Sequence, residues 1–267
     1  MTSPERFDAL TEGLVAGVRG QGGLIGLVLL GSASTEAGAR RDEWSDHDFF
    51  ALTEPGRGAQ ARRSLAWLPD RERIVLTARE GEIGFVALYD DGHVFEFAFS
   101  DAAELSGAVA GEATVVVDDA EGTTAALIER SRRRAAAADR FDPENDVRLV
   151  LVKLLIGVGR ARRGETLAAG SFVRQWAVAH LVRALRGRFA DRSTAHRDAI
   201  DPVRRFERDF PFEASRIAEA VAHPVEQAAR ELFELTRTWL EPEWDGFPTA
   251  AADAVARRLD GSRPDRA

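Results

Sequence analysis

The chain has 267 residues, of which 45% are hydrophobic, so it is long enough for one large domain or two modest ones. It contains no cysteine, which excludes disulfides, zinc–thiolate sites and a cysteine nucleophile and fits a cytoplasmic protein. No apolar run approaches the roughly 18 residues of a membrane span, and the N-terminus lacks the pattern of a signal peptide. We therefore expect no membrane partner.

The net charge of −8 is unevenly distributed along the chain. Residues 1–125 hold 10 basic and 22 acidic side chains, whereas residues 126–208 hold 19 basic and 10 acidic ones. The acidic first part argues against a nucleic-acid partner and would suit a cationic small molecule. The basic segment could face a polyphosphate, or its arginines could simply form solvated helix faces.

The first part of the chain combines helical and strand patterns. A helical pattern begins at Ser3 and Pro4 and runs to about residue 18. An Asp-Asp-Gly turn at 90–92 predicts a hairpin between two of the later strands. Apolar or alternating runs predict strands at 24–30, 46–52, 73–77, 85–89, 94–99 and 113–117, with a helix at 57–67.

After about residue 121 the strand patterns disappear and helical ones repeat. Asp142, Pro143 and Glu144 combine a cap, a proline at the first helical position and an acidic first turn, which predicts a helix to about residue 163. Further helices are expected at 166–186, 202–208 and 213–222 and after Pro224 and Pro248. The predicted fold class is α+β, with a mixed sheet and helices over residues 1–120 and an all-α domain over residues 121–267.

Three acidic residues suggest a metal site. Asp46 and Asp48 are two apart on a predicted strand, so both carboxylates project from one face, and His47 projects from the other. Two carboxylates about 7 Å apart repel each other unless a cation lies between them, and hard oxygen ligands favour Mg²⁺ with phosphates. Glu96 lies in an apolar strand whose phenylalanines occupy the opposite face, and partial burial would suit it to act as a general base.

A Gly-Ser pair precedes these acids. Gly31 ends a strand and lets backbone amides approach a phosphate, and Ser32 adds a hydroxyl group. A helix that starts there would also point its positive dipole end at the phosphate. We therefore expect Gly31 and Ser32 to hold the β- and γ-phosphates of a nucleotide whose metal ion is bound by Asp46 and Asp48.

The order of these motifs resembles the signature of the nucleotidyltransferase superfamily with the polymerase-β palm fold. In this chain the signature consists of an apolar strand, Gly31-Ser32, a 13-residue spacer, Asp46-x-Asp48 and a later strand bearing Glu96. His47 departs from that signature, because the residue between the acids is usually apolar. The alternative is a surface Gly-Ser turn with exposed aspartates and an edge-strand glutamate.

Within this superfamily the chain is similar to the antibiotic nucleotidyltransferases, and most of all to the two-domain lincosamide nucleotidyltransferases. The matches are Ser45 to Phe50, Glu96-Phe97 with Phe99 and Asp101, and helical segments at 162–165, 231–240 and 252–259. The resemblance implies AMP transfer from ATP-Mg²⁺ to a hydroxyl of a lincosamide or aminoglycoside, often by a homodimer. It also implies a metal site of Asp46, Asp48 and Glu96, with Glu96 as the catalytic base, and it places Gly31, Ser32 and Ser45 at the nucleotide.

Lys153 is the only lysine of the chain and lies in an almost wholly apolar helix. A buried ammonium needs a counter-charge, so Lys153 could contact the triphosphate, as a lysine at this place does in several nucleotidyltransferases. It could instead pair with a core carboxylate, or its stem could reach solvent. Trp176 and His180 share a helix face and could line an acceptor pocket, although core packing is the favoured prediction.

Two other classes of function remain open. The chain could be the nucleotidyltransferase half of a toxin–antitoxin pair that modifies a protein or RNA. It could also retain the fold without catalysis, although the presence of all three carboxylates argues against that.

Overall fold

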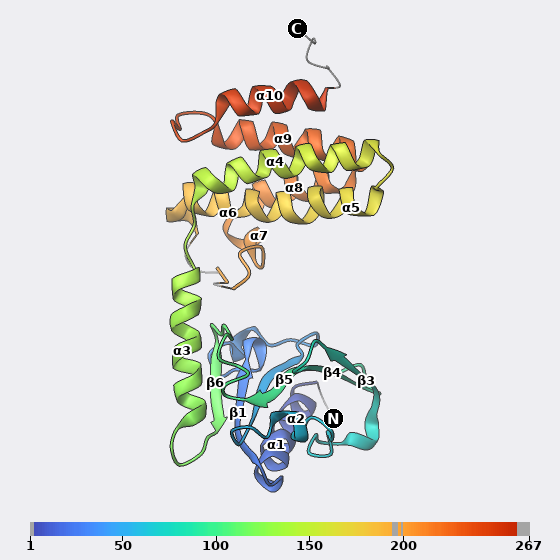
Figure 1. The fold of residues 1–267 in the computed structure, drawn as a ribbon, viewed down its shortest axis with the longest axis vertical. Helices are drawn as coiled ribbons and strands as arrows, with labels where there is room; N and C mark the ends of the chain where they lie inside the picture. Colours follow the sequence, from blue (N-terminus) through green and yellow to red (C-terminus); the bar gives the residue numbers. More distant parts are fainter. Residues whose placement is uncertain (1–2, 194–196, 199, 261–267) are drawn as a thin grey trace. The chain divides into compact units, whose positions relative to one another are not determined.

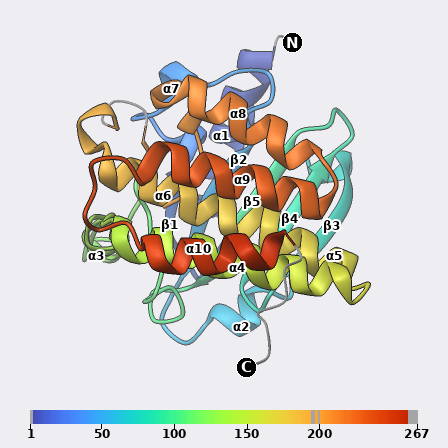
Figure 2. The same cartoon turned by 90° about the horizontal axis from the view of Figure 1, so that it is seen from above.

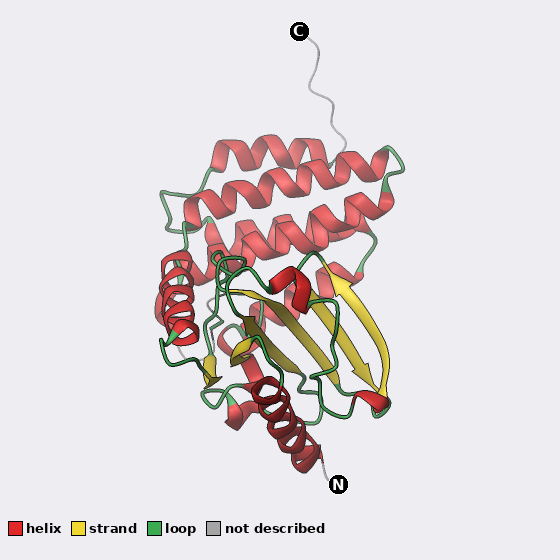
Figure 3. Ribbon diagram, turned by 60° about the horizontal axis from the view of Figure 1, so that its bottom comes forward, coloured by secondary structure: helices red, strands yellow, loops and turns green. Residues whose placement is uncertain are grey.

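The computed structural model describes residues 3–193, 197–198 and 200–260. The chain divides into two compact units, Met1–Ala138 and Asp139–Ala267. Every strand of the described chain lies in the first unit, and the regular structure described in the second unit is helical (Figure 3). The predicted α+β class with a helical second part is therefore confirmed.

The division of the chain lies later than the expected boundary at 120/121. Helix α3 (Thr123–Ala138) runs along β6 and β1 of the sheet (Figure 1). Its buried Leu127 and Ile128 share an apolar cluster with Val28 and Leu52 of two strands. Because α3 covers one face of the sheet, it belongs to the first unit.

The sheet of the first unit has six strands in the order β3-β4-β5-β2-β1-β6. All neighbours are antiparallel except β2 and β5, which are parallel. All six predicted strands are present, with ends shifted by a few residues. Their bounds are β1 Leu24–Leu30, β2 His47–Thr53, β3 Ile74–Glu80, β4 Gly84–Tyr89, β5 Val94–Asp101 and β6 Ala113–Val117.

Side-chain alternation divides the central strands between two apolar clusters. Phe49 and Ala51 of β2 pack in the cluster that contains Leu10 and Leu14 of α1 (Ser3–Gly20). Leu52 packs in the other cluster, with α3. Residues one position apart on β2 therefore face different helices, and this decides which polar groups can meet.

The predicted helix at 57–67 is wrong in its extent. Helix α2 covers only Gly58–Ala61, and the chain then turns. Trp67 and Leu68 are buried in the cluster under α1, where the Trp67 ring contacts Phe97 and Phe99. Tertiary packing of these side chains overrides the local helical pattern.

The second unit is a helical bundle in its described residues. Helix α4 begins as predicted, with Asp142 accepting a hydrogen bond from the Asn145 amide at 3.0 Å. The helix expected at 166–186 contains a π-helical segment, and the helix expected at 202–208 is reduced to a single turn. The bounds are α4 Pro143–Arg162, α5 Thr166–Gly170, η4 Ser171–Ala177, α6 Val178–Arg188, α7 Phe206–Asp209, α8 Pro211–Ala222, α9 Val225–Leu240 and α10 Thr249–Leu259.

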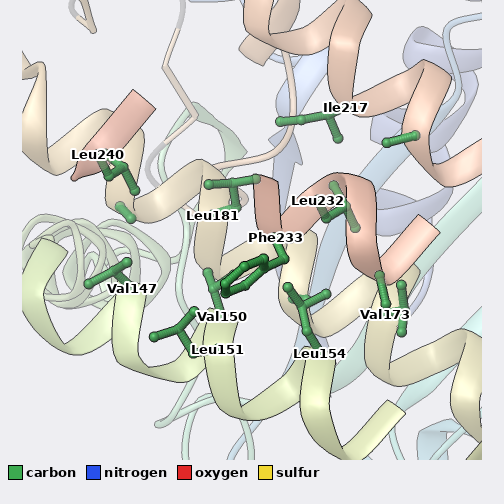
Figure 4. Close-up of a cluster of buried hydrophobic side chains, with 14 of the residues drawn as sticks. Val147, Val150, Leu151, Leu154, Val173, Leu181, Ile217, Leu232, Phe233 and Leu240 are labelled. Carbon is green, nitrogen blue, oxygen red and sulfur yellow. The ribbon is translucent and has the colours of Figure 1, made fainter. Parts of the chain in front are cut away.

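The core of the bundle is formed mainly by α4, α6, η4 and α9. Helices α9 and α10 lie beside α4 (Figure 2). The Phe233 ring of α9 lies among Val150, Leu154 and Leu232, all buried (Figure 4). None of the helices in the described part of the chain is long and apolar enough to cross a membrane.

The ion pair of Arg186 allows a test of what stabilises the bundle. The Arg186 side chain is fully buried and pairs at 2.7 Å with the carboxylate of Asp209, of which 4% is exposed, while it also donates to Ser193 and to the Pro202 carbonyl. Arg186→Ala would leave the Asp209 charge buried without its partner, so we expect the free energy of unfolding to fall by about 3–5 kcal/mol. Urea unfolding followed by circular dichroism measures this loss.

The double variant Arg186→Met/Asp209→Leu is the control, because it removes both charges and keeps apolar volume. It should recover much of the lost stability. An unchanged urea midpoint for Arg186→Ala would show that the pair does not stabilise the bundle.

Candidate active site

The strand register brings two of the predicted acids side by side. Leu30 of β1 pairs with Asp48 of β2, and Asp48 pairs with Glu96 of β5. Residues directly opposite each other on neighbouring strands project from the same face, and such strands lie about 4.8 Å apart. A Cβ atom added at Gly31 would lie 3.5 Å from Oδ2 of Asp48, so the Gly-Ser bend adjoins this carboxylate. We call Asp46, Asp48 and Glu96 the carboxylate row.

Asp46 lies immediately before β2, not inside it as expected. Its carbonyl is 3.4 Å from the Ser32 hydroxyl, which ties the Gly-Ser bend to the start of the strand. Asp46 and Asp48 are half-buried and Glu96 is exposed. Among the described residues, the carboxylates of Asp46 and Glu96 have no hydrogen-bond or ion-pair partner.

Two details of the prediction are wrong. Glu96 is exposed and not partly buried, because Val86 and Ala98 beside it do not cover its side chain. Partial burial therefore cannot be the property that would suit Glu96 to act as a general base. No long helix starts at Gly31. The residues Gly31–Ala33 form a single 3₁₀ turn, so a helix dipole does not contribute to phosphate binding. Gly31 has φ +49°, a left-handed conformation that favours glycine.

The hydroxyl of Ser45 is engaged within its own turn. It donates to Oδ1 of Asp42 at 3.1 Å and accepts from the Asp42 amide at 3.0 Å. The same turn exposes 85% of Trp44, two residues before Asp46. The sequence interpretation did not consider Trp44, although a tryptophan inside an otherwise polar segment could have drawn attention to it.

The carboxylate row matches Mg²⁺ in the chemistry of its ligands but is not a preformed cage. Among the described residues, no three His, Cys, Asp or Glu side chains converge to hold a metal ion. Mg²⁺ is usually held by one or two protein carboxylates together with water and substrate phosphates. Asp46 and Asp48 supply that number of hard oxygen ligands, so the row fits an ion that arrives with a polyphosphate.

The cavity described in the first unit lies elsewhere. It has a volume of about 370 Å³ and adjoins Leu24 and Glu54, at the ends of β1 and β2 that are remote from Gly31 and Asp48. None of the predicted site residues lines this cavity. Its lining residues are Gln21, Gly22, Gly23, Leu24, Glu54, Arg57, Gln60, Ala61, Ser64, Trp67 and Phe99.

His47 points away from the carboxylate row, as predicted, and is completely buried. The Thr11 hydroxyl donates to the Phe7 carbonyl at 3.1 Å and lies 2.8 Å from Nε2 of His47, so it accepts a hydrogen bond from the N–H group of that nitrogen. Nδ1 of His47 then accepts from Nε2 of His93 at 2.7 Å. This chain of hydrogen bonds joins α1, β2 and the β4–β5 hairpin beneath the row.

Three candidate residues lie in the second unit. The ammonium of Lys153 lies over the rings of Phe172 and Trp176. Among the described residues no carboxylate is within salt-bridge distance of it, so the alternative of a pairing with a core carboxylate is not seen there. Trp176 is 45% exposed, so the favoured prediction of core packing is wrong for this side chain. His180 is held by buried Asp146 at 2.9 Å.

The buried histidines predict a pH dependence of stability. Burial lowers the pKa of His47 to about 2 and also lowers the pKa of His93. A histidine in the unfolded chain binds a proton below about pH 6.5, and the folded chain does not, so stability falls as the pH decreases from that value. Each histidine contributes a slope of up to about 1.4 kcal/mol per pH unit.

His47→Gln should therefore show a shallower decrease in unfolding free energy than the wild type between about pH 6.5 and pH 5. Urea titrations at a series of pH values give both slopes. Parallel slopes would contradict the assignment of a neutral, buried imidazole at this position.

The likeness of this chain to known proteins is confined to weak structural overlap. No model of a protein family matches the sequence, and no curated protein is similar to it. A nucleotidyltransferase-like protein from Exiguobacterium sibiricum superposes with a TM-score of 0.35 and 11% identity, over 97% of this chain and 80% of that one. An aminoglycoside 6-adenyltransferase from Bacillus subtilis superposes with a TM-score of 0.27 and 11% identity, over 96% of this chain and 92% of that one. Neither overlap is close enough to establish the family or the activity of this chain.

Proposed function

We propose that the chain is a Mg²⁺-dependent nucleotidyltransferase that moves AMP from ATP to a hydroxyl of a small molecule and releases pyrophosphate. The observation that supports this most is the register that sets Asp48 beside Glu96 and against Gly31. The motif resemblance to the antibiotic nucleotidyltransferases adds the reaction type. A fold kept only for structure would gain nothing from the carboxylates of Asp46 and Glu96, which have no ion-pair partner among the described residues.

Asp46 and Asp48 would hold the metal ion together with the triphosphate. Bound there, Mg²⁺ would neutralise the charge on the phosphates. Ser32 and Ser45 belong to the nucleotide side of the site in this proposal, and so does Lys153, whose ammonium has no carboxylate partner among the described residues.

Glu96 acts as the general base in the proposed reaction. It accepts the proton of the acceptor hydroxyl, and the hydroxyl oxygen forms a bond to the α-phosphorus. The bond between the α-phosphorus and the oxygen that bridges to the β-phosphate breaks, and pyrophosphate leaves. The exposure of Glu96 suits this role, because an acceptor molecule can reach its carboxylate from solvent.

The acceptor class that we propose is a cationic antibiotic, such as a lincosamide or an aminoglycoside. The excess of acidic over basic side chains in residues 1–125 would attract a cation. We further propose a cytoplasmic protein that acts as a homodimer, as the resemblance implies. Modification of a protein or RNA partner, as in a toxin–antitoxin pair, is the competing outcome.

Pyrophosphate release from ATP-Mg²⁺, measured across a panel of lincosamides and aminoglycosides, tests the proposal. Release that depends on one of these acceptors supports it. A lack of release with every member would refute the small-molecule acceptor and point to a macromolecular one.

Glu96→Gln tests the base. We expect turnover with the acceptor to fall by about 10²–10⁴-fold while ATP binding is retained, because the amide keeps the shape of the side chain but cannot accept the proton. Steady-state pyrophosphate assays and calorimetric titration with ATP measure the two quantities.

Glu80→Gln is the matched control, since Glu80 is an exposed strand glutamate of the same unit, on β3. It should leave turnover unchanged. Retained turnover in Glu96→Gln, or equal losses in both variants, would refute the role of Glu96.

A further inference from the structure

The cavity described in the first unit lies where the turn after α1 meets the segment after β2. The Glu54 amide donates to the Gly23 carbonyl at 3.0 Å, which joins the two segments at the cavity. Leu24 lies at this end of β1, whereas Leu30, the partner of Asp48, lies six residues or about 20 Å further along the strand. A ligand in the cavity would therefore bind apart from the carboxylate row. We call this space the α2 cavity, because α2 lines part of it.

The most deeply buried residues of the cavity lining are aromatic. Trp67 and Phe99 are 5% and 1% exposed, and their ring centroids are 5.1 Å apart. The Trp67 segment lies tightly against α1, because a Cβ atom added at Gly17 would overlap the Trp67 carbonyl oxygen. Leu24 and Ala61 add apolar surface to the lining. An apolar group of a ligand would therefore be removed from water in this part of the cavity.

One carboxylate and one guanidinium also line the cavity. Oε2 of Glu54 lies 3.8 Å from Nε of Arg57, and the two side chains are 52% and 60% exposed. An exposed pair at this distance stabilises the fold little, so both charges are available to a ligand. Nη1 of Arg57 donates to Oε1 of Gln60 at 3.3 Å. Nη2 of Arg57 and the amide NH₂ group of Gln60 are left as donors without an acceptor among the described residues.

A ligand that meets all of these groups has two opposite charges and an apolar body. Its carboxylate can accept hydrogen bonds from Arg57 and Gln60, and its ammonium can donate to Glu54. In an α-amino acid both charged groups are attached to one carbon atom, so they can meet two side chains whose charged atoms are this close. The amino-acid side chain then extends towards Trp67 and Phe99. A volume of about 370 Å³ is typical of small-molecule sites and leaves room for a large side chain.

We propose that the α2 cavity binds a free α-amino acid with a large apolar side chain, such as leucine, phenylalanine or tryptophan. Glu54 and Arg57 together carry no net charge, which matches a zwitterion better than a ligand of a single charge. The inference goes beyond nucleotidyl transfer and does not depend on it, because no residue of the carboxylate row lines the cavity.

Calorimetric titration of the full-length protein with phenylalanine, in EDTA and without ATP, tests the cavity. Phenylalanine should bind at least about 10-fold more tightly than alanine, because its ring is buried on the apolar part of the lining. It should also bind at least about 10-fold more tightly than 3-phenylpropanoate, which lacks the ammonium, and than phenylalaninamide, which lacks the carboxylate. Each of these compounds loses a hydrogen bond between charged groups.

Variants of the two charged residues assign the contacts. Glu54→Gln should lose the preference for phenylalanine over 3-phenylpropanoate, and Arg57→Gln should lose the preference over phenylalaninamide. Arg63→Gln is the matched control, since Arg63 is an exposed arginine of the same unit outside the cavity lining, and it should bind phenylalanine as the wild type does. All three side chains are exposed, so we expect the variants to remain folded, which circular dichroism checks.

Three results would overturn the proposal. The first is the absence of saturable binding of leucine, phenylalanine and tryptophan to the wild type. The second is phenylalanine binding that both Glu54→Gln and Arg57→Gln leave unchanged, and the third is a loss of binding in Asp48→Asn, since the ligand would then lie elsewhere. Because these titrations contain no ATP, their outcome is independent of the pyrophosphate assays that test the transferase.

Discussion

The parallel pairing of β2 with β5 is the contact on which the first unit and its candidate chemistry depend. It is the one parallel pair in a sheet whose other neighbours are antiparallel, and it joins the Asp46–Asp48 segment to a strand almost 50 residues later. A shift of one residue in this register would turn Glu96 toward the aromatic cluster under α1 and place Phe95 or Phe97 at the carboxylate row. The three phenylalanines of β5 prevent that shift, because each is buried in the cluster.

The alternation along β2 also explains why a histidine stands between the two aspartates. The position of His47 faces α1, where an apolar side chain would pack equally well, but the imidazole makes two hydrogen bonds there. One of them reaches His93 at the end of the β4–β5 hairpin, and the other reaches Thr11 of α1. The strand that holds the aspartates is therefore fixed from its buried side by directional bonds, which leave less freedom than apolar packing alone.

The sequence predicted the features that depend on local periodicity. Alternation placed His47 on the buried face of β2 and Asp48 on the other, and the Asp142-Pro143 cap located the start of α4. Features set by distant contacts were not predictable in the same way. The exposure of Glu96 depends on how fully Val86 and Ala98 cover it, and the early end of α2 depends on Trp67 reaching the core. The boundary after Ala138 depends on α3 packing on the sheet.

The pattern of ion pairs explains why a different charged residue stands out in each unit. Arginines pair widely with acids in this chain, as the bidentate contact of Arg62 with Glu104 and the buried pair of Arg186 with Asp209 show. Against that background, Asp46 in the first unit and Lys153 in the second are half-buried charges without an ion-pair partner among the described residues. A half-buried charge loses hydration, and neither Asp46 nor Lys153 regains that loss through an ion pair with a described residue, so each is retained at a cost in stability. A bound cation would supply the counter-charge that the Asp46 carboxylate lacks, and a bound anion would supply the one that the Lys153 ammonium lacks.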